Sequence, residues 1–410
     1  MLKNIKIEDY LYPLPEERIA RFPLERRDDS RLLVYTESSG ESPVSASFKD
    51  ISRFLPSGGV MVFNETKVVP ARMFFQRPTG AIIEIFCLEP NTPSDYQLNF
   101  AATSSCQWKV IVGNLKKWKG DTLSLCNPDN DSAVSAIDLK AELVEKEGNT
   151  CIVRFLWSTG ISFSEVLSHC GRIPIPPYLK RETQEIDLER YQTLYAKREG
   201  SVAAPTAGLH FTSKELDDIA EKGIETLKLS LHVGAGTFLP VKSEYIADHT
   251  MHSEPFEIGI AFLRALKAAC NDSVIAVGTT STRCLESLYF LGVHCMEKGE
   301  PGIVSQWEPY RDEGYAYCTE EALGALLDYM ETNNMEKLVS RTQIIIVPGY
   351  KFRIIDYLVT NFHQPGSTLL LLISAFIGDS WRKVYDFALE NDFRFLSYGD
   401  SSLLQKRNTE

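Results

Sequence analysis

Long hydrophobic runs are missing from this sequence. Its longest strongly apolar stretch runs from Thr368 to Ile377 and is interrupted by Ser374, so it is too short to span a bilayer. The first eighteen residues, MLKNIKIEDYLYPLPEER, do not contain the apolar core of a signal peptide. We therefore expect a cytoplasmic protein that has no membrane partner.

Paired cysteine motifs are also missing. The chain has nine cysteines, an odd number, and no two of them are spaced as CxxC. This pattern favours reduced thiols over a disulfide scaffold or a zinc ribbon. The segment HTMHSE places two histidines three residues apart, but Pro255 follows at once and no HExxH motif is present. We therefore predict no metal site.

The common nucleotide and hydrolase motifs are absent, and positive charge is scarce. There is no Walker loop, nucleophile elbow or kinase signature, which leaves the usual routes to ATP and serine hydrolysis unsupported. The net charge of −12 argues against a protein that coats nucleic acid non-specifically. Two local basic clusters remain, one of five arginines between Arg18 and Arg31 and one in the segment Lys116-Lys117-Trp118-Lys119. Each is either a phosphate-binding surface or a solvated face.

The residues that are present predict two domains in a chain of 410 residues. Apolar runs of strand and helix character alternate over 1–67 and 159–410, which predicts an α/β domain with a mixed sheet, either layered or closed as a distorted barrel. Between them, 68–158 holds six short β-like runs separated by turn residues, which predicts an inserted antiparallel β-barrel. Within the second half, 295–342 is expected to be a surface elaboration, and 343–347 is expected to be a strand.

The segment GSVAAPTAGLHFT, Gly200 to Thr212, is the stretch least suited to fill a core. Its small residues, Thr206 and Gly208 among them, allow a ligand to approach the backbone, and His210 supplies a titratable group. Thr212 or Ser213 is expected to cap the helix that follows. The alternative is a Gly/Ala-rich loop around a buried histidine.

Polar residues follow several apolar strands, at the position where open α/β sheets bind ligands. In VGTTSTR, the threonines and a helix N-terminus suit an anion, Arg283 adds donors, and Glu286 is expected to pair with Arg283; a simple helix cap is the alternative. The candidate residues at these strand ends are Asn64; His232, Gly234, Gly236 and Thr237; Thr279, Thr280, Ser281 and Arg283; Asn361 and His363; and Ser397, Tyr398 and Asp400.

Taken together, these segments resemble the S-adenosylmethionine:tRNA ribosyltransferase-isomerase family of queuosine biosynthesis, of which the chain looks like a somewhat divergent member. The similar segments extend over nearly the whole chain. They are RDDSRLLVY, VFNETKVVPARM, GRIPIPPYLKR, RYQTLYAKREGSVAAPTAGLHFT, LHVGAGTFLPV, HTMHSEPFEI, AVGTTSTRCLES, LVTNFHQPGSTLLLLISAF and RFLSYGDSSLL.

The resemblance implies a reaction in which S-adenosylmethionine is a co-substrate and no cofactor is needed. The family transfers the ribosyl part of S-adenosylmethionine to 7-aminomethyl-7-deazaguanine at the wobble position of tRNA and isomerises it, giving epoxyqueuosine and releasing adenine and methionine. An alternative is a paralogue that uses the same ribosyl donor with a non-tRNA acceptor. A non-catalytic RNA-binding protein is a further alternative.

The chemistry of this reaction needs at least one base and one acid, and neutral histidine suits the role of base near pH 7. Our candidates for acid–base groups are His210, His232, Glu254 and Asp400, with His210 or His232 preferred as the base. Arg283 and Thr280 are expected to hold a carboxylate or ribose hydroxyls, and Arg72 is added to the substrate-binding candidates. Lys116, Lys117 and Lys119 are expected to contact tRNA phosphates. We expect a monomer.

Overall fold

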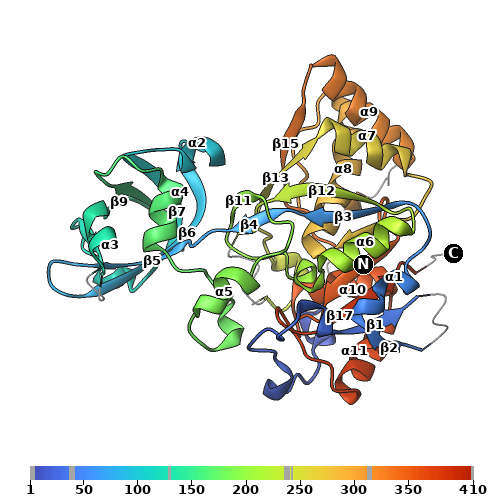
Figure 1. The fold of residues 1–410 in the computed structure, drawn as a ribbon. Helices are drawn as coiled ribbons and strands as arrows, with labels where there is room; N and C mark the ends of the chain where they lie inside the picture. The colour runs from blue at the N-terminus through green and yellow to red at the C-terminus, as the bar shows by residue number, and fades with distance from the viewer. Residues whose placement is uncertain are drawn as a thin grey trace.

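A computed structural model of the chain describes residues 5–36, 42–127, 131–234, 241, 243–311 and 316–407. Figure 1 shows two bodies side by side, a large one built on a mixed sheet and a smaller barrel to its left. The predicted fold class, a mixed α/β domain with an inserted antiparallel barrel, is confirmed. No helix among the described residues is both long enough and apolar enough to cross a membrane.

Nine strands form the main sheet, and its centre is parallel. The order is β15 (Lys337–Thr342), β13 (Glu254–Gly259), β12 (Glu225–Leu231), β3 (Val60–Asn64), β14 (Val274–Val277), β16 (Tyr357–Asn361), β17 (Ser401–Gln405), β1 (Arg31–Tyr35) and β2 (Val44–Ser47). At the centre of this order, β3 runs parallel to both β12 and β14, and β14 runs parallel to β16. Strand β17 is antiparallel to β16. The carboxyl ends of the parallel strands therefore meet at one edge of the sheet.

Helices cover both faces of the sheet, which explains why β3 and β14 are buried along their whole length. Alternate residues of β3 enter different cores: Val60 and Val62 join one, and Met61 and Phe63 join the other. The first core includes residues of α7 (Ile260–Ala268), α8 (Thr279–Lys298), α9 (Thr319–Thr332), α10 (Thr368–Ile377) and α11 (Ser380–Glu390). The second includes residues of α1 (Ile51–Phe54) and α6 (Ser213–Glu221).

The inserted barrel closes with six antiparallel strands in the order β10-β7-β6-β5-β8-β9. The six runs predicted from turn spacing correspond to these strands, whose bounds are β5 (Arg72–Gln76), β6 (Ile82–Thr92), β7 (Ser105–Gly113), β8 (Leu123–Leu125), β9 (Lys140–Glu147) and β10 (Thr150–Leu156). Three short helices belong to this region, α2 (Tyr96–Phe100), α3 (Ser132–Ile137) and α4 (Phe163–Cys170). Phe163, Val166 and Leu167 of α4 pack into the barrel core.

Contacts between described side chains join the barrel to the main body. The ring of Tyr96 in α2 stacks on that of His232, which follows β12, with 4.1 Å between centroids and 9° between planes. Arg341 of β15 pairs with Glu89 of β6 at 3.1 Å. The chain passes between the bodies near a two-stranded parallel sheet of β4 (Thr66–Val68) and β11 (Arg198–Ser201), and α5 (Glu185–Arg190) lies below it (Figure 1).

The predicted strand over 343–347 is wrong. The strand of this region is β15, which ends at Thr342, and the next five residues continue without a ladder. Their backbone groups bond to loops and side chains instead: the Ile345 amide donates to the Gln306 carbonyl at 3.3 Å, and the Val347 amide donates to the Tyr310 hydroxyl at 2.9 Å. The apolar side chains of this segment are buried, as a strand would require, but an apolar run alone does not distinguish a strand from other buried segments.

The region 295–342 contributes directly to the main body. It contains α9, which packs on α8 and α7, and β15, which is the first strand of the nine-stranded sheet. Helix α8 ends at Lys298, and Gly299 after it takes a φ of 80°.

Candidate functional site

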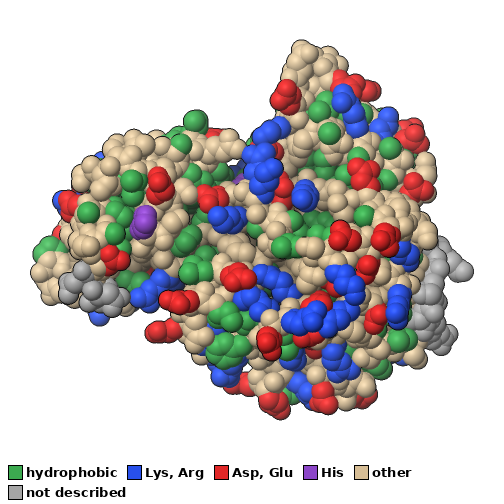
Figure 2. All heavy atoms as spheres, viewed as in Figure 1, with side chains coloured by type: hydrophobic (Ala, Val, Ile, Leu, Met, Phe, Trp, Pro, Cys, Tyr) green, Lys and Arg blue, Asp and Glu red, His purple; other side chains and the backbone are tan. Residues whose placement is uncertain are grey.

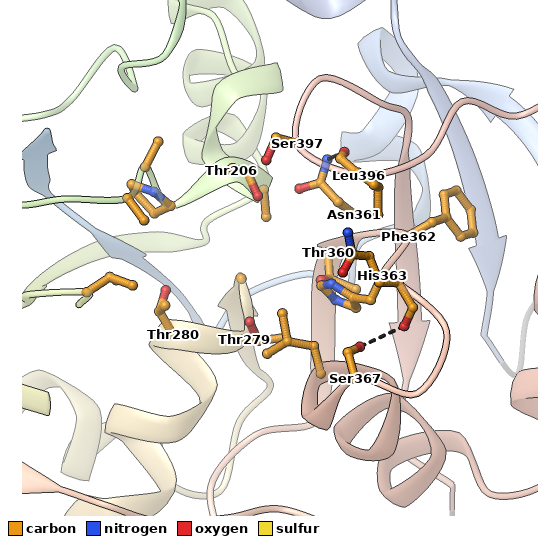
Figure 3. A pocket seen from close by; sticks show the side chains of 18 of the residues that line it. Thr206, Thr279, Thr280, Thr360, Asn361, Phe362, His363, Ser367, Leu396 and Ser397 are labelled. Carbon is orange, nitrogen blue, oxygen red and sulfur yellow. Dashed lines mark hydrogen bonds between the residues drawn. The ribbon is translucent and has the colours of Figure 1, made fainter. Parts of the chain in front are cut away.

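A pocket opens at the carboxyl ends of β14 and β16, next to the segment that carries Thr206. Figure 3 shows Thr279 and Thr280 at the start of α8, across from Asn361 and His363. Six of the predicted site residues line this pocket: Thr206, Thr279, Thr280, Asn361, His363 and Ser397. We call it the substrate pocket. The structure thus brings together residues from four segments that are far apart in the sequence.

The turn between β14 and α8 positions the two threonines. Gly278 takes a φ of 87°, and its amide donates to the Val359 carbonyl at 2.8 Å, which ties this turn to β16. Because α8 begins directly after Gly278 and has no side-chain cap, its first amides have no partner within the helix. The Thr280 hydroxyl is buried and has no hydrogen-bond partner among the described residues. This corner can therefore donate several hydrogen bonds to an oxygen-rich ligand.

The opposite wall is formed by Asn361 and His363. The Asn361 side-chain amide donates to the Leu396 carbonyl and to His210 Nε2, both at 3.2 Å, while its Oδ1 is buried and unpartnered within the described chain. His363 Nε2 lies 3.0 Å from the Thr360 hydroxyl. Burial lowers the pKa of His363 to about 3, so the ring is neutral at neutral pH. This wall offers a free amide oxygen and an uncharged imidazole.

His210 lies behind this wall and is connected to the substrate pocket through Asn361. Its ring packs against Phe48, with 5.1 Å between centroids. Burial, followed by the charges of Arg394 and Arg27, lowers its pKa to about 3. His210 lines a second, smaller pocket, together with Tyr398 and Ser397.

Three other predicted acid–base candidates lie outside the substrate pocket. His232 stacks on Tyr96 of the barrel, and burial lowers its pKa to about 4. Glu254 forms a buried ion pair with Arg283. The Asp400 carboxylate accepts hydrogen bonds from the backbone amides of Arg31, at 3.0 Å, and Arg394, at 2.8 Å. Each of these three side chains therefore contacts another segment of the protein and holds two elements of the fold together.

The remaining candidates at strand ends also bond within the protein. Asn64 and the backbone of Leu231 exchange hydrogen bonds of 3.0 and 3.1 Å, and the Ser281 hydroxyl donates to the Val277 carbonyl at 2.8 Å. The Tyr398 hydroxyl donates to Asp187 at 2.7 Å. Arg72 pairs with Glu84 in the barrel, and Gly208 approaches the Tyr195 hydroxyl so closely that an added Cβ would lie 1.9 Å from it.

The loop after β12 is only partly described. Gly234 follows the buried residue Val233, which lines the substrate pocket. Gly236 and Thr237 lie outside the described residues.

The expected pairing of Arg283 with Glu286 is wrong. The Glu286 carboxylate accepts hydrogen bonds from the Tyr350 hydroxyl at 2.8 Å and from three successive backbone amides at 2.9–3.1 Å, those of residues 353–355. Burial raises the pKa of Glu286 despite these donors. Arg283 instead donates to Glu254 and to the Ile344 carbonyl. The two side chains are three residues apart on one helix, but each bonds to a different neighbouring segment.

Sequence reasoning missed part of the pocket lining. Five additional polar residues border the pocket: Tyr178, Tyr191, Thr360, Gln364 and Ser367. A signal was available, since all five lie within segments that were singled out: GRIPIPPYLKR, RYQTLYAKREGSVAAPTAGLHFT and LVTNFHQPGSTLLLLISAF.

The lysines predicted to contact tRNA lie on the barrel surface. Lys116, Lys117 and Lys119 are exposed, whereas Trp118 between them is buried and donates its indole N–H to the Asp121 carbonyl at 2.7 Å. The tryptophan therefore anchors the segment and is not available as a stacking platform for a base. Among the described residues, no group of three or more His, Cys, Asp or Glu side chains could hold a metal ion.

Comparisons with known proteins show the family to which the chain belongs. The model of the family described as "Queuosine biosynthesis protein" matches residues 7–404. Two similar proteins, both named S-adenosylmethionine:tRNA ribosyltransferase-isomerase, come from Syntrophomonas wolfei (38 % identical, covering 97 % of each chain) and Halothermothrix orenii (38 % identical, covering 98 % of this chain and 100 % of the other). A crystal structure of an S-adenosylmethionine tRNA ribosyltransferase from Thermotoga maritima is 25 % identical over 97 % of this chain and 99 % of the other, with a TM-score of 0.45.

The mixed sheet, its pocket at the carboxyl ends of parallel strands and the inserted barrel define a two-domain protein of the α/β class. The chain belongs to the queuosine biosynthesis protein family, and it is an enzyme of the transferase–isomerase type.

Proposed function

We propose that this enzyme transfers the ribosyl moiety of S-adenosylmethionine to 7-aminomethyl-7-deazaguanine at the wobble position of tRNA and isomerises it, with release of adenine and methionine. Family membership and the names of the similar proteins support the ribosyltransferase–isomerase reaction. The acceptor base, the epoxyqueuosine product and the two leaving groups are part of the proposal. Cytoplasmic localisation and a monomeric state stay predictions.

The observation that carries the proposal is the lining of the substrate pocket. Three buried polar atoms in this lining, the Tyr191 hydroxyl oxygen, Thr280 Oγ1 and Asn361 Oδ1, have no partner among the described residues, and the last two lie on opposite walls. A buried polar group without a partner costs free energy, so such atoms are kept where a ligand satisfies them. One donor and one acceptor on opposite walls suit the ribose hydroxyls and the adenine edge of S-adenosylmethionine.

The proposed reaction needs a base for two steps: removal of a proton from a carbon next to the sulfonium, and deprotonation of the amine that attacks the sugar. His363 lines the substrate pocket, and burial keeps its ring neutral, so one ring nitrogen has a lone pair that can accept a proton. We therefore propose His363 as the base at this site, in place of His210 or His232. His210 acts as a positioning residue, because it accepts a hydrogen bond from Asn361.

The test measures adenine release and tRNA mass after incubation with S-adenosylmethionine and tRNA that carries the aminomethyl-deazaguanine. The expected result is adenine release coupled to a heavier wobble nucleoside. Production of S-adenosylhomocysteine would contradict the proposal, since it would indicate methyl transfer. Equal turnover with the free base would favour the non-tRNA acceptor.

Thr280→Val tests the pocket itself, because it removes one hydroxyl and keeps the shape of the side chain. Loss of a buried hydrogen bond of about 1.5–3 kcal/mol predicts a decrease in kcat/KM of roughly 10- to 100-fold. Thr332→Val on the exposed end of α9 is the matched control and should retain wild-type turnover. An unchanged kcat/KM for Thr280→Val would exclude this hydroxyl from substrate binding.

A further inference from the structure

The second pocket lies behind His210 and shares Ser397 with the substrate pocket. Three arginines from distant segments line it, Arg27, Arg190 and Arg394, together with Ser30 and His210. We call it the arginine pocket. Arg27 belongs to the arginine-rich N-terminal segment, whose other members have different partners: Arg18 pairs with Asp392, Arg21 with Glu16 and Arg26 with Asp28, and Arg31 donates to the Ser45 hydroxyl.

Positive charge in the arginine pocket is only partly neutralised. Arg27 donates to three backbone carbonyls, those of Glu189, Gln192 and Leu209, at 2.8, 2.7 and 3.3 Å. Arg190 donates to the carbonyls of Leu24 and Glu25 at 2.7 and 2.9 Å.

Carbonyl oxygens satisfy the N–H groups but do not cancel the charge. In the described part of the chain, neither Arg27 nor Arg190 has a carboxylate within 4.0 Å, and only Arg394 has an acidic partner, Asp400 at 3.5 Å. Burial, and then the charge of Arg190, lower the pKa of Arg27.

Two uncharged donors complete the pocket. Ser30 is 2 % exposed, and its hydroxyl has no hydrogen-bond partner among the described residues. The Asn361 amide nitrogen is oriented by its bond to the Leu396 carbonyl, so it donates to His210 Nε2. The neutral His210 ring therefore carries its proton on Nδ1 and is a second donor.

We propose that the arginine pocket binds an oxyanion, a carboxylate or a phosphate, beside the substrate pocket. Guanidinium groups match the geometry of both anions, and charge-assisted hydrogen bonds to them are about twice as strong as neutral ones. The source of the anion depends on the proposed function: it is the carboxylate of the methionine part of S-adenosylmethionine or a phosphodiester of tRNA. Figure 2 shows Lys and Arg side chains, with Asp and Glu among them, on the face of the main body that is turned to the viewer.

Inorganic phosphate is the first probe, and its binding can be measured without catalytic turnover. The melting temperature is measured in phosphate and in chloride at equal ionic strength. Phosphate should stabilise the wild type, because a ligand that binds only the folded state raises its stability. The phosphate response should be lost in Arg190→Gln and reduced in Ser30→Ala, which removes a hydroxyl that has no described partner.

The matched control is Arg264→Gln on α7, which removes one exposed arginine from a salt bridge with Glu331 and should keep the full response. No response in the wild type, or an equal response in all four proteins, would overturn the proposal.

Binding measurements then identify the source of the anion. If it is the carboxylate, Arg190→Gln should weaken S-adenosylmethionine binding at least tenfold and leave tRNA binding unchanged. If it is a phosphodiester, the variant should weaken tRNA binding and reduce its salt slope by about 1. Unchanged affinity for both substrates would overturn a role in substrate binding. Failure of the proposed function has a different signature: the phosphate response persists, but the wild type does not release adenine.

Discussion

The buried ion pair between Arg283 and Glu254 provides a quantitative test of whether Glu254 is structural. The two side chains are 8 % and 6 % exposed, and they connect the first turns of α8 to β13. Replacing Arg283 with Met leaves a carboxylate buried without its partner, which typically costs 3–5 kcal/mol. Arg283 Nη2 already has no partner among the described residues, so we expect a value near the lower end of that range.

The expected shift in melting temperature follows from the size of the protein. An unfolding entropy of about 2.1 cal/mol/K per residue gives about 0.9 kcal/mol/K for 410 residues, so a loss of 3–5 kcal/mol lowers the melting temperature by about 4–6 °C. Adding Glu254→Gln should recover more than half of this loss, because no unpaired charge then remains.

Differential scanning calorimetry of the wild type, both single variants and the double variant measures this effect. A decrease of 1 °C or less for Arg283→Met would refute the reasoning. Turnover of Glu254→Gln provides a second check. If Glu254 were a catalytic acid or base, this variant would lose activity while the double variant recovered stability without recovering activity.

Three further predictions concern pH, tRNA binding and the contact between the two bodies. The folded-state pKa values of His210, His232 and His363, about 3, 4 and 3, lie below the unfolded value of about 6.5. The free energy of unfolding should therefore fall as the pH drops below about 6.5, by about 1.4 kcal/mol per pH unit for each of these histidines. His363→Gln removes one of the three, so it should reduce the loss of melting temperature between pH 7 and pH 5 by roughly a third. Replacing Lys116, Lys117 and Lys119 with Gln should weaken tRNA binding and flatten its salt dependence, whereas Lys298→Gln should not. Gly200→Ala should lower the melting temperature more than Gly223→Ala. A Cβ added at Gly200 would lie 2.6 Å from Tyr96 and 2.7 Å from His232, whereas a Cβ added at Gly223 would have no described atom within 4 Å. Equal shifts in melting temperature would contradict this account of the contact.

The sequence predicted the elements better than the partners of the polar side chains. The turn spacing of the barrel strands is a local pattern, and it could be recognised from the sequence. The position of Thr280 and Asn361 in one pocket was also foreseeable, because both follow parallel strands.

The contacts of Glu254, Glu286 and Asp400 could not be predicted from the sequence. Each carboxylate is satisfied by groups that only the folded chain brings close, such as the backbone amides that Asp400 and Glu286 bind. A polar residue after a strand looks the same in sequence whether it binds a ligand or a distant backbone amide.

The two adjoining pockets separate charge in a way that suits the proposed co-substrate. No Lys, Arg, Asp or Glu is among the described residues that line the substrate pocket, and its histidine is neutral. The three guanidinium groups lie instead in the arginine pocket, on the other side of Asn361 and His210. A sulfonium cation would be repelled by arginines in its own pocket, whereas a carboxylate or phosphate on the same substrates gains from arginines next to it. Adding a positive charge to the substrate pocket, as in Thr280→Lys, should therefore abolish S-adenosylmethionine binding while leaving the phosphate response of the arginine pocket intact.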